Sequence, residues 1–339
     1  MKRIIALLLV LLLAFALVGC GGSDQSTTTG DNTNETTETA DDMKTNTDAA
    51  GEDTVIVGVS SMNSVEPFYR IMQDGMEAKA DELGIKLDVV SADGDIAKQT
   101  GQIEDFITNK VDAIVAMPCD GEGIVTAIEA ANTAGIPIFT ADIGAPNADV
   151  ASYIASDSYA GGKAIGEWLI ERLAGEEGNV IIMNDSKLDS VYLRADGFKD
   201  AVAGSNINII EEANVGYQRD VAMKAVEDYL IAYPDLNVVF TAQGTDVALA
   251  ANDAVAAAGK TGDVIVCSFD GFEETVNALR SGTSAIEVDA FNDAYAVGEI
   301  TIETVADMLA GKKVEKLIKI PVPLITKENV DAFYEEHYS

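Results

Sequence analysis

The sequence is poor in histidine, cysteine and basic residues. Its one histidine, His337, is near the C-terminal end of 339 residues, which excludes catalytic triads built on histidine and multi-histidine metal sites. Its three cysteines, Cys20, Cys119 and Cys267, match neither a disulfide framework nor a zinc knuckle. Acidic residues outnumber basic ones 57 to 22, and the net charge of −35 repels nucleic acid. We therefore expect no nucleic-acid partner, no metal and no cofactor.

Nucleotide-binding and catalytic motifs are missing as well. At the end of the first predicted strand, Val57-Gly58-Val59-Ser60 runs into Ser61-Met62-Asn63 without a Gly-x-Gly-x-x-Gly fingerprint. Gly161-Gly162 lacks the spaced glycines of a phosphate loop, and no Gly-x-Ser-x-Gly nucleophile elbow is present. Asp93-Gly94-Asp95 lacks the later oxygen ligands of a calcium loop. We expect a protein that is not an enzyme.

The N-terminal residues are typical of an export signal. Lys2 and Arg3 precede an apolar run from Ile4 to Val18, which is too short for a comfortable membrane span. The run ends Leu17-Val18-Gly19-Cys20, which resembles a bacterial lipobox. This resemblance implies cleavage before Cys20 and acylation of its thiol with palmitate-like chains. We expect a lipoprotein signal peptide at 1–20 and an extracytoplasmic protein that is lipid-anchored to the cell membrane; the alternative is a non-lipidated signal.

Residues 21–53 contain mainly Ser, Thr, Asn, Gly and acidic residues, with almost no apolar side chains. Such a segment buries too little apolar surface to offset the loss of chain entropy on folding. We predict a disordered acidic stalk between the anchor and the folded body. A linker without any such role is the alternative.

From Thr54 onward, short β-branched runs alternate with amphipathic stretches of helical period. This pattern predicts an α/β fold of two similar, doubly wound parallel-sheet lobes. The predicted strands are Val55–Val59, Leu87–Val90, Ala113–Met117, Pro137–Thr140, Val180–Met183, Ile207–Glu212, Val238–Thr241, Val264–Ser268 and Ala285–Val288. The predicted helices are Pro67–Leu83, Ile96–Asn109, Gly121–Ala134, Ser190–Ala203, Asp220–Tyr233 and Asp246–Ala258. Trp168, at helical spacing with Ile165 and Leu169, is expected in the core.

Ligands of such sheets lie beyond the carboxyl ends of the strands, so we expect a cleft between the lobes. The loop after the first strand carries Glu66, Pro67, Phe68 and Tyr69. An aromatic ring can cover the apolar face of a ligand while a carboxylate accepts hydrogen bonds from hydroxyls at its edge. The alternative is that both aromatic residues belong to the core at the start of a helix.

Several motifs occur in a fixed order along the chain. They are Pro67-Phe68-Tyr69, Gly135-Ile136-Pro137 before a strand ending in Asp142, Ile154–Asp157 followed by Gly161-Gly162, Arg194 ahead of Gly197-Phe198, and Phe269-Asp270-Gly271. In this order the chain resembles the sugar-binding type I periplasmic binding proteins, especially the ribose-binding branch, from Thr54 to about Val330.

This resemblance implies two lobes joined by a three-strand hinge, with crossings near Ser156-Asp157, Asp289-Ala290 and Lys319-Ile320. The N-terminal lobe would comprise 54–156 and 290–319, and the C-terminal lobe 157–289 and 320–339. The implied function is capture of a small carbohydrate by hinge closure and delivery to the permease of an ABC importer. We expect a monomer. A ligand sensor feeding a chemoreceptor or histidine kinase is the alternative function.

The resemblance also implies ligand-binding residues. Phe68 and Tyr69 would flank the ligand, Asp142 and Asp270 would accept from its hydroxyls, and Arg194 would donate to it. The remaining implied contacts are Ser60, Glu66, Tyr217, Gln243, Asp246 and Asp289, the last beside Asn292 at the crossover. Taken without the resemblance, Asp142 and Asp270 fit turn residues and Arg194 a surface ion pair.

Two departures from the ribose-binding pattern concern charge. Ile143 follows Asp142 where ribose binders carry an arginine, and Glu66 replaces an amide in a loop about two residues longer. The pocket is therefore richer in acceptors, even with Arg194 and Arg219 present. This argues against ribose itself and leaves a polyol, an amino-sugar, a nucleoside or an amine open. We expect Cys119 and Cys267 to be free thiols in different lobes, because a bridge would lock the cleft.

Overall fold

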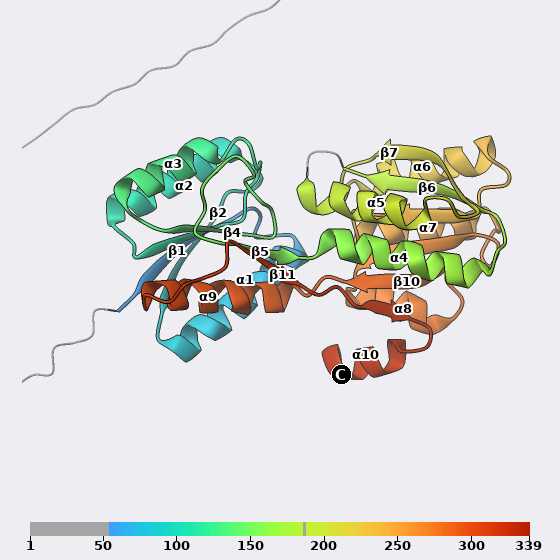
Figure 1. The fold of residues 1–339 in the computed structure, drawn as a ribbon. Helices are drawn as coiled ribbons and strands as arrows, with labels where there is room; N and C mark the ends of the chain where they lie inside the picture. The colour runs from blue at the N-terminus through green and yellow to red at the C-terminus, as the bar shows by residue number, and fades with distance from the viewer. Residues whose placement is uncertain (1–53, 186–187) are drawn as a thin grey trace, which may run out of the picture. The chain divides into compact units, whose positions relative to one another are not determined.

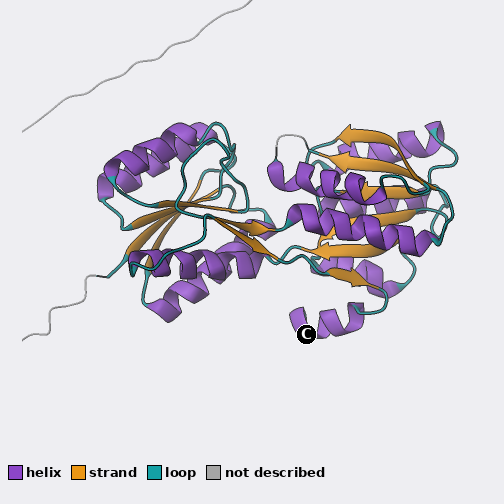
Figure 2. Cartoon of the chain, in the orientation of Figure 1, coloured by secondary structure: helices purple, strands orange, loops and turns teal. Residues whose placement is uncertain are grey.

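The computed structural model describes residues 54–185 and 188–339. These residues form two α/β lobes, each built on a six-stranded sheet with helices on both faces (Figure 1, Figure 2). The predicted signal peptide with Cys20 and the predicted stalk are outside the described residues. Within the described part, no helix has the length and apolar character needed to cross a membrane.

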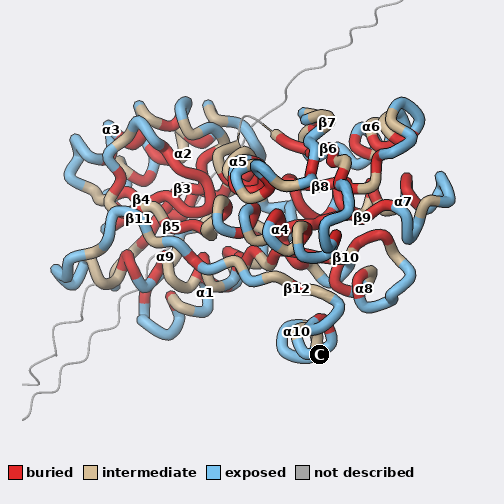
Figure 3. Tube along the Cα trace, turned by 45° about the vertical axis from the view of Figure 1, so that its right-hand side comes forward, coloured by how far each residue is buried: buried red, intermediate tan, exposed pale blue. Residues whose placement is uncertain are grey.

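The first sheet is entirely parallel, in the strand order β11-β5-β4-β3-β1-β2. Its central strands β3 and β4 are fully buried apolar runs, as expected where helices cover both faces (Figure 3). The strands are β1 (Ile56–Ser61), β2 (Lys86–Ser91), β3 (Ala113–Ala116), β4 (Ile138–Ala141), β5 (Tyr153–Ser156) and β11 (Leu317–Ile320).

Two helix pairs cover this sheet. One face carries α1 (Pro67–Leu83) and α9 (Ala294–Leu309), and the other carries α2 (Ile96–Asn109) and α3 (Val125–Ala134). Alternate residues of β3 serve the two sides: Val115 packs with α1 and α9, whereas Ile114 packs with α2 and α3. Pro67 occupies the first turn of α1, and the Asp95 carboxylate caps α2.

The second sheet has the order β12-β10-β9-β8-β6-β7 and is parallel except for β12. Its strands are β6 (Gly178–Asn184), β7 (Ile207–Asn214), β8 (Val238–Thr241), β9 (Ile265–Asp270), β10 (Ile286–Phe291) and β12 (Leu324–Thr326). The helices α4 (Ser158–Leu173) and α5 (Asp189–Val202) cover one face, and α6 (Arg219–Ala232) and α7 (Thr245–Ala257) the other. Short helices α8 (Glu273–Ser281) and α10 (Val330–His337) pack together beside β12. Trp168 of α4 is half-buried against the core.

The chain passes between the sheets three times: between β5 and α4, between β10 and α9, and between β11 and β12. The second and third crossings come later than the sequence predicted. Asp289 and Ala290 still pair with β9, and Ile320 still pairs with Ser156 of β5. Each strand continues to the carboxyl edge of its sheet, and the chain crosses to the other lobe only after that edge.

Glycines allow one close helix contact in each lobe. A Cβ atom at Gly298 of α9 would be 2.0 Å from the Met72 carbonyl oxygen of α1. A Cβ atom at Gly162 of α4 would be 1.9 Å from the Arg194 carbonyl oxygen of α5. These contacts set the positions of α1 and α5, the two helices that carry Tyr69 and Arg194.

Candidate functional site

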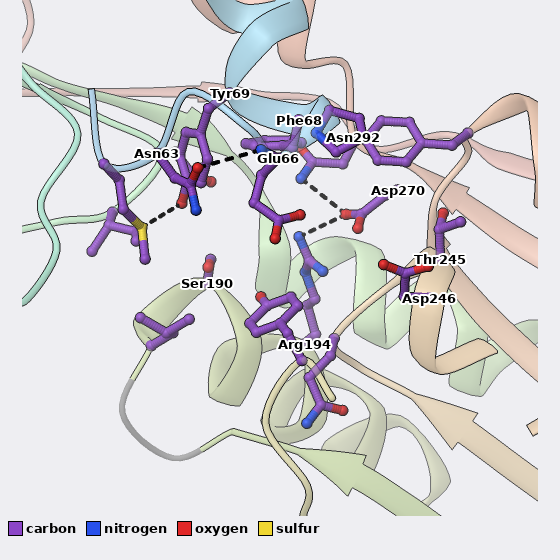
Figure 4. Close-up of a pocket in the computed structure, with 18 of the residues that line it drawn as sticks. Asn63, Glu66, Phe68, Tyr69, Ser190, Arg194, Thr245, Asp246, Asp270 and Asn292 are labelled. Carbon is purple, nitrogen blue, oxygen red and sulfur yellow. Dashed lines mark hydrogen bonds and ion pairs between the residues drawn. The ribbon is translucent and has the colours of Figure 1, made fainter. Parts of the chain in front are cut away.

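A cavity of about 390 Å³ lies between the lobes at the carboxyl ends of the strands (Figure 4). The first lobe contributes Met62, Asn63, Glu66, Pro67, Phe68, Tyr69, Asp142 and Ile143. The second lobe contributes Leu188, Ser190, Arg194, Tyr217, Arg219, Gln243, Thr245, Asp246, Leu249, Asp270, Phe272 and Glu274, and Asn292 comes from the second crossing. The cavity thus gathers all the predicted site residues except Ser60 and Asp289.

Asp142 follows β4 in the left-handed backbone region, with φ of 65°, and only 8% of it is exposed. The Tyr69 hydroxyl donates to its Oδ2 at 3.1 Å. Burial raises the pKa of the Asp142 carboxyl to about 7, although the Arg194 charge acts in the opposite direction. Burial and the neighbouring Asp142 also raise the pKa of Tyr69, so the phenol remains a donor.

Asp270 ends β9 and is also in the left-handed region, with φ of 88°. Arg194 Nη2 lies 3.2 Å from Asp270 Oδ1, and both side chains are almost fully buried. Asn292 Nδ2 donates to the same oxygen at 3.3 Å, so two donors converge on this carboxylate (Figure 4). The Arg194 guanidinium also covers the Phe269 ring, 3.8 Å from its centroid, and donates to the Ala242 carbonyl at 2.9 Å. The arginine is therefore held by its surroundings before any ligand arrives.

The turn after Asp270 is held on both sides by hydrogen bonds. The Gly271 amide donates to Asp289 Oδ1 at 3.1 Å, and the Tyr338 hydroxyl donates to the Gly271 carbonyl at 2.6 Å. Asp289 was predicted to contact the ligand. In the structure it is fully buried, does not line the cavity and lies behind the turn. It lies within β10, whereas Asn292, just past the strand, reaches the cavity.

Ser60 is the second predicted residue that the structure places elsewhere. It is fully buried in β1, and its hydroxyl donates to Gln102 Oε1 at 2.8 Å. The strand continues through Ser61, so the cavity is lined by the following loop residues Met62 and Asn63 instead.

Several lining residues were missed by sequence reasoning. Ser190 and Thr245 are in the first turns of α5 and α7, each of which follows a strand at the cleft edge. A search of helix starts after predicted strands would have found both. Leu188, Leu249 and Phe272 carry no polar signal and are recognisable only from the fold.

Three buried polar atoms of the cavity residues have no hydrogen-bond partner: Arg194 Nε, Gln243 Oε1 and Thr245 Oγ1. The Gln243 amide nitrogen already donates to the carbonyls of Asn184 at 2.6 Å and Gly216 at 3.0 Å. Its oxygen is therefore an acceptor without a donor. Unpaired buried polar atoms are costly; the two others among the described residues, Thr140 Oγ1 and Asp289 Oδ2, belong to side chains outside the lining.

The cavity mouth is acidic. Glu66, Asp246 and Glu274 are exposed there, and partial burial together with Asp246 raises the pKa of Glu66. Tyr217 is 47% exposed at the same mouth. Across residues 54–185 and 188–339, no group of three or more His, Cys, Asp or Glu is arranged to hold a metal ion. Cys119 and Cys267 are free thiols in different lobes.

The lobes contact each other beside the cavity. Asp189 of α5 accepts from the Gly144 amide of the first lobe at 3.2 Å, and the Tyr153 hydroxyl lies 3.4 Å from the same carboxylate oxygen. At the crossings, Lys319 pairs with Asp157 at 3.0 Å, and the Ser156 hydroxyl donates to Asn292. Asn292 therefore joins the crossing segment to Asp270.

Known proteins share this architecture. The ribose import binding protein of Haemophilus influenzae is 33% identical over 277 residues, covering 81% of this chain and 91% of that protein. A solved ABC transporter solute binding protein from Mycobacterium smegmatis, with bound glycerol, has 33% identity and a TM-score of 0.76 over 82% of this chain and 96% of that one. Another from Bacillus halodurans, with bound myo-inositol, has 27% identity and a TM-score of 0.78 over 85% and 100%. Residues 57–313 match the family described as periplasmic binding protein domain, and the chain belongs to that family.

Proposed function

We propose that the protein captures a small hydroxylated molecule, a monosaccharide or polyol, between its lobes and delivers it to the permease of an ABC importer. The observation that carries this proposal is the cavity between the lobes, where carboxylates, an arginine and aromatic rings converge beside unpaired buried polar atoms. The relatives named for ribose import and the structure with bound myo-inositol support the same ligand class.

The side chains divide the recognition between them. Asp142 and Asp270 accept hydrogen bonds from ligand hydroxyls, and the Arg194 guanidinium donates to a ligand oxygen. Phe68 and Tyr69 meet edge to face, with ring centroids 5.5 Å apart, and give apolar cover to the carbon face of the ligand. This combination suits a compact ring with hydroxyls around its edge.

Closure of the lobes couples binding to transport. A ligand favours the closed form because only there do both lobes contact it. Shifting the ratio of closed to open molecules from 1:99 to 99:1 requires a ligand that binds the closed form more tightly than the open form by about 5.5 kcal/mol. Several charge-assisted hydrogen bonds supply this difference. Asn292 contributes to this coupling because it contacts both Asp270 and the crossing residue Ser156.

Members of this family are binding proteins, and we propose that the ligand leaves unaltered. The one histidine of the chain, His337, packs against Phe291 and Phe333, with ring centroids 4.8 and 4.2 Å away, and does not line the cavity. An unchanged ligand, recovered after incubation with the purified protein, is the expected result.

We also propose that Cys20 carries the lipid anchor of an extracytoplasmic, monomeric binding protein. The support is the sequence Leu17-Val18-Gly19-Cys20 after a short apolar run. Replacing Cys20 with Ser is expected to move the protein from the detergent phase to the aqueous phase in a phase-partition assay. Unchanged partition would contradict the anchor and leave the ligand proposal intact.

A ligand screen tests the main proposal. The purified protein is titrated with monosaccharides and polyols, with thermal unfolding and small-angle scattering as readouts. A ligand at a hundred times its dissociation constant should stabilise the fold by about 2.7 kcal/mol and reduce the radius of gyration. Stabilisation without compaction would argue against hinge closure, and no stabilisation by any member would argue against this ligand class.

A further inference from the structure

Acidic side chains dominate the charged residues of the cavity. They are Glu66, Asp142, Asp246, Asp270 and Glu274, against the two basic residues Arg194 and Arg219. Both arginines are already engaged: Arg194 with Asp270 at 3.2 Å, and Arg219 with Asp253 at 2.7 Å and Asp246 at 3.9 Å. The cavity therefore has more carboxylate charge than its own cations compensate.

The excess of carboxylate charge in the cavity differs between the two lobes. On the wall contributed by the first lobe, the charged residues are Glu66 and Asp142, and both are acidic. Within the described residues, neither forms an ion pair with a lysine or arginine of the chain. Figure 4 shows Glu66 extending from this wall toward the middle of the cavity. A ligand group resting against the first lobe thus meets two carboxylates and the rings of Phe68 and Tyr69.

The unpaired buried atoms add an independent requirement for donors. Gln243 and Thr245 are 2% and 8% exposed, and each has an oxygen without a partner. Gln243 Oε1 can only accept, Arg194 Nε can only donate, and the Thr245 hydroxyl can do either. A ligand that completes this site therefore supplies at least one donor and at least one acceptor. An ammonium group carries three donors, whereas each hydroxyl carries one.

We propose that the preferred ligand is a polyhydroxy compound bearing a protonated amino group, with the ammonium against Glu66 and Asp142 and the hydroxyls toward Arg194 and Asp270. This inference rests on the proposed function and names the ligand class within it. The acidic mouth steers such a cation inward and repels anionic analogues. The aromatic rings of the first lobe stabilise a cation through their faces as well as covering carbon.

Titration of Asp142 gives a readout specific to charge. Burial raises its pKa to about 7, well above the usual value for a carboxyl. An ammonium beside the carboxyl favours the ionised form. Binding of an amine near pH 7 should therefore release protons from this group, whereas binding of the hydroxyl partner should not. The release is measured by calorimetry in two buffers of different ionisation enthalpy.

The experiment compares matched pairs of compounds that differ by one amino group. The pairs are D-glucose and D-glucosamine, D-galactose and D-galactosamine, myo-inositol and its monoamino analogue, and xylitol and 1-amino-1-deoxyxylitol. Each is titrated into the purified protein and into the variants Glu66→Gln and Asp142→Asn, which keep side-chain shape but lose charge. Asp74→Asn is the control, because Asp74 is an exposed acid on the same helix as Tyr69 and does not line the cavity.

We expect at least one amine to bind at least tenfold more tightly than its hydroxyl partner. That advantage should fall to threefold or less in Glu66→Gln and Asp142→Asn and persist in Asp74→Asn. Hydroxyl compounds that bind as tightly as their amines would overturn the inference and leave the proposed function standing. An amine advantage untouched by both cavity variants would overturn the assigned position. If no member of any pair binds, the proposed function fails together with the inference.

Discussion

Asp142 and Asp270 hold equivalent places in the two lobes but have different partners. Asp142 follows β4 and Asp270 ends β9, and these strands hold the same position in the order of their sheets. Both residues have positive φ and are almost fully buried at the cavity. Asp270 faces the Arg194 guanidinium and the Asn292 amide, whereas Asp142 faces the Tyr69 hydroxyl. The pKa of Asp142 rises to about 7 as a result of its burial without a paired cation.

This difference shows that the repeated fold determines where a carboxylate is placed and that its neighbours determine its chemistry. The second-lobe site is complete in itself, because its acid and its arginine neutralise each other. In the first lobe, no cationic side chain of the described residues pairs with Asp142, so its charge is compensated by water, by a proton or by a ligand. Breaking each site separately tests how far the comparison extends to binding.

The largest expected effect comes from Asp270→Asn. The variant keeps a residue that tolerates positive φ but leaves Arg194 buried without its counter-charge, which costs about 3 kcal/mol. We expect affinity for a neutral sugar ligand to fall by about a hundredfold in calorimetric titration. Asp142→Asn, whose amide oxygen still accepts a hydrogen bond, should cost about tenfold or less. Equal losses would contradict the distinction between the lobes. Asp228→Asn, in an exposed pair with Lys224, is the control.

The next effect concerns the helix contacts. Gly162→Ala should push α5 and Arg194 away from α4, and Gly298→Ala should push α1 and Tyr69 away from α9, each destabilising the fold by about 2 kcal/mol. Urea unfolding measures this. Gly101→Ala is the matched control, because it is in α2 with open space around its Cβ position and should stabilise by up to about 1 kcal/mol. If Gly162→Ala were as harmless as Gly101→Ala, the close contact would not fix Arg194.

The pH dependence of stability reports on the Asp142 carboxyl. The pKa of Asp142 rises from its usual 3.8 to about 7 on folding, so the folded protein binds the proton more tightly than the unfolded chain. The contribution of this group to the free energy of unfolding therefore decreases between about pH 4 and pH 7. Asp142→Asn should be more stable than the parent at pH 8, and this advantage should shrink toward pH 4, measured by denaturant unfolding. A gain that is independent of pH would contradict the raised pKa of Asp142.

The smallest expected effect is that of Tyr338→Phe. The variant loses the hydrogen bond to the Gly271 carbonyl, worth about 1 kcal/mol, and loosens the turn that presents Asp270. Affinity should fall about fivefold, and a double-mutant cycle with Asp270→Asn should be non-additive. Additive effects would indicate that Tyr338 stabilises the fold without orienting the carboxylate. Tyr334→Phe, which removes an exposed hydrogen bond to Glu273, is the matched control.

The repeating βα pattern predicted every central strand because these strands are apolar runs buried on both faces. The edge strands β11 and β12 were missed because they are short and partly exposed, and β5 was missed because both of its ends are only partly buried. The crossings were placed early at Asp289-Ala290 because nothing in the local sequence marks how far a strand runs toward the sheet edge.

The lining of the cavity was predictable at the family motifs: Asp142 and Asp270 are at strand ends, and Arg194 is in α5 ahead of Gly197-Phe198. Ser60 was misplaced because β1 continues through Ser61, so that the cavity is lined by Met62 and Asn63 instead. Asn292 and Tyr338 were beyond prediction, since their contacts join segments distant in the chain: Asn292 to Ser156 and Asp270, and Tyr338 to Gly271.

The hydrogen bond from Tyr338 to Gly271 has a practical consequence for anyone who prepares this protein. An affinity tag or reporter placed next to Tyr338 would lie beside a group that holds the turn after Asp270 at the cavity. Such a fusion is expected to weaken binding.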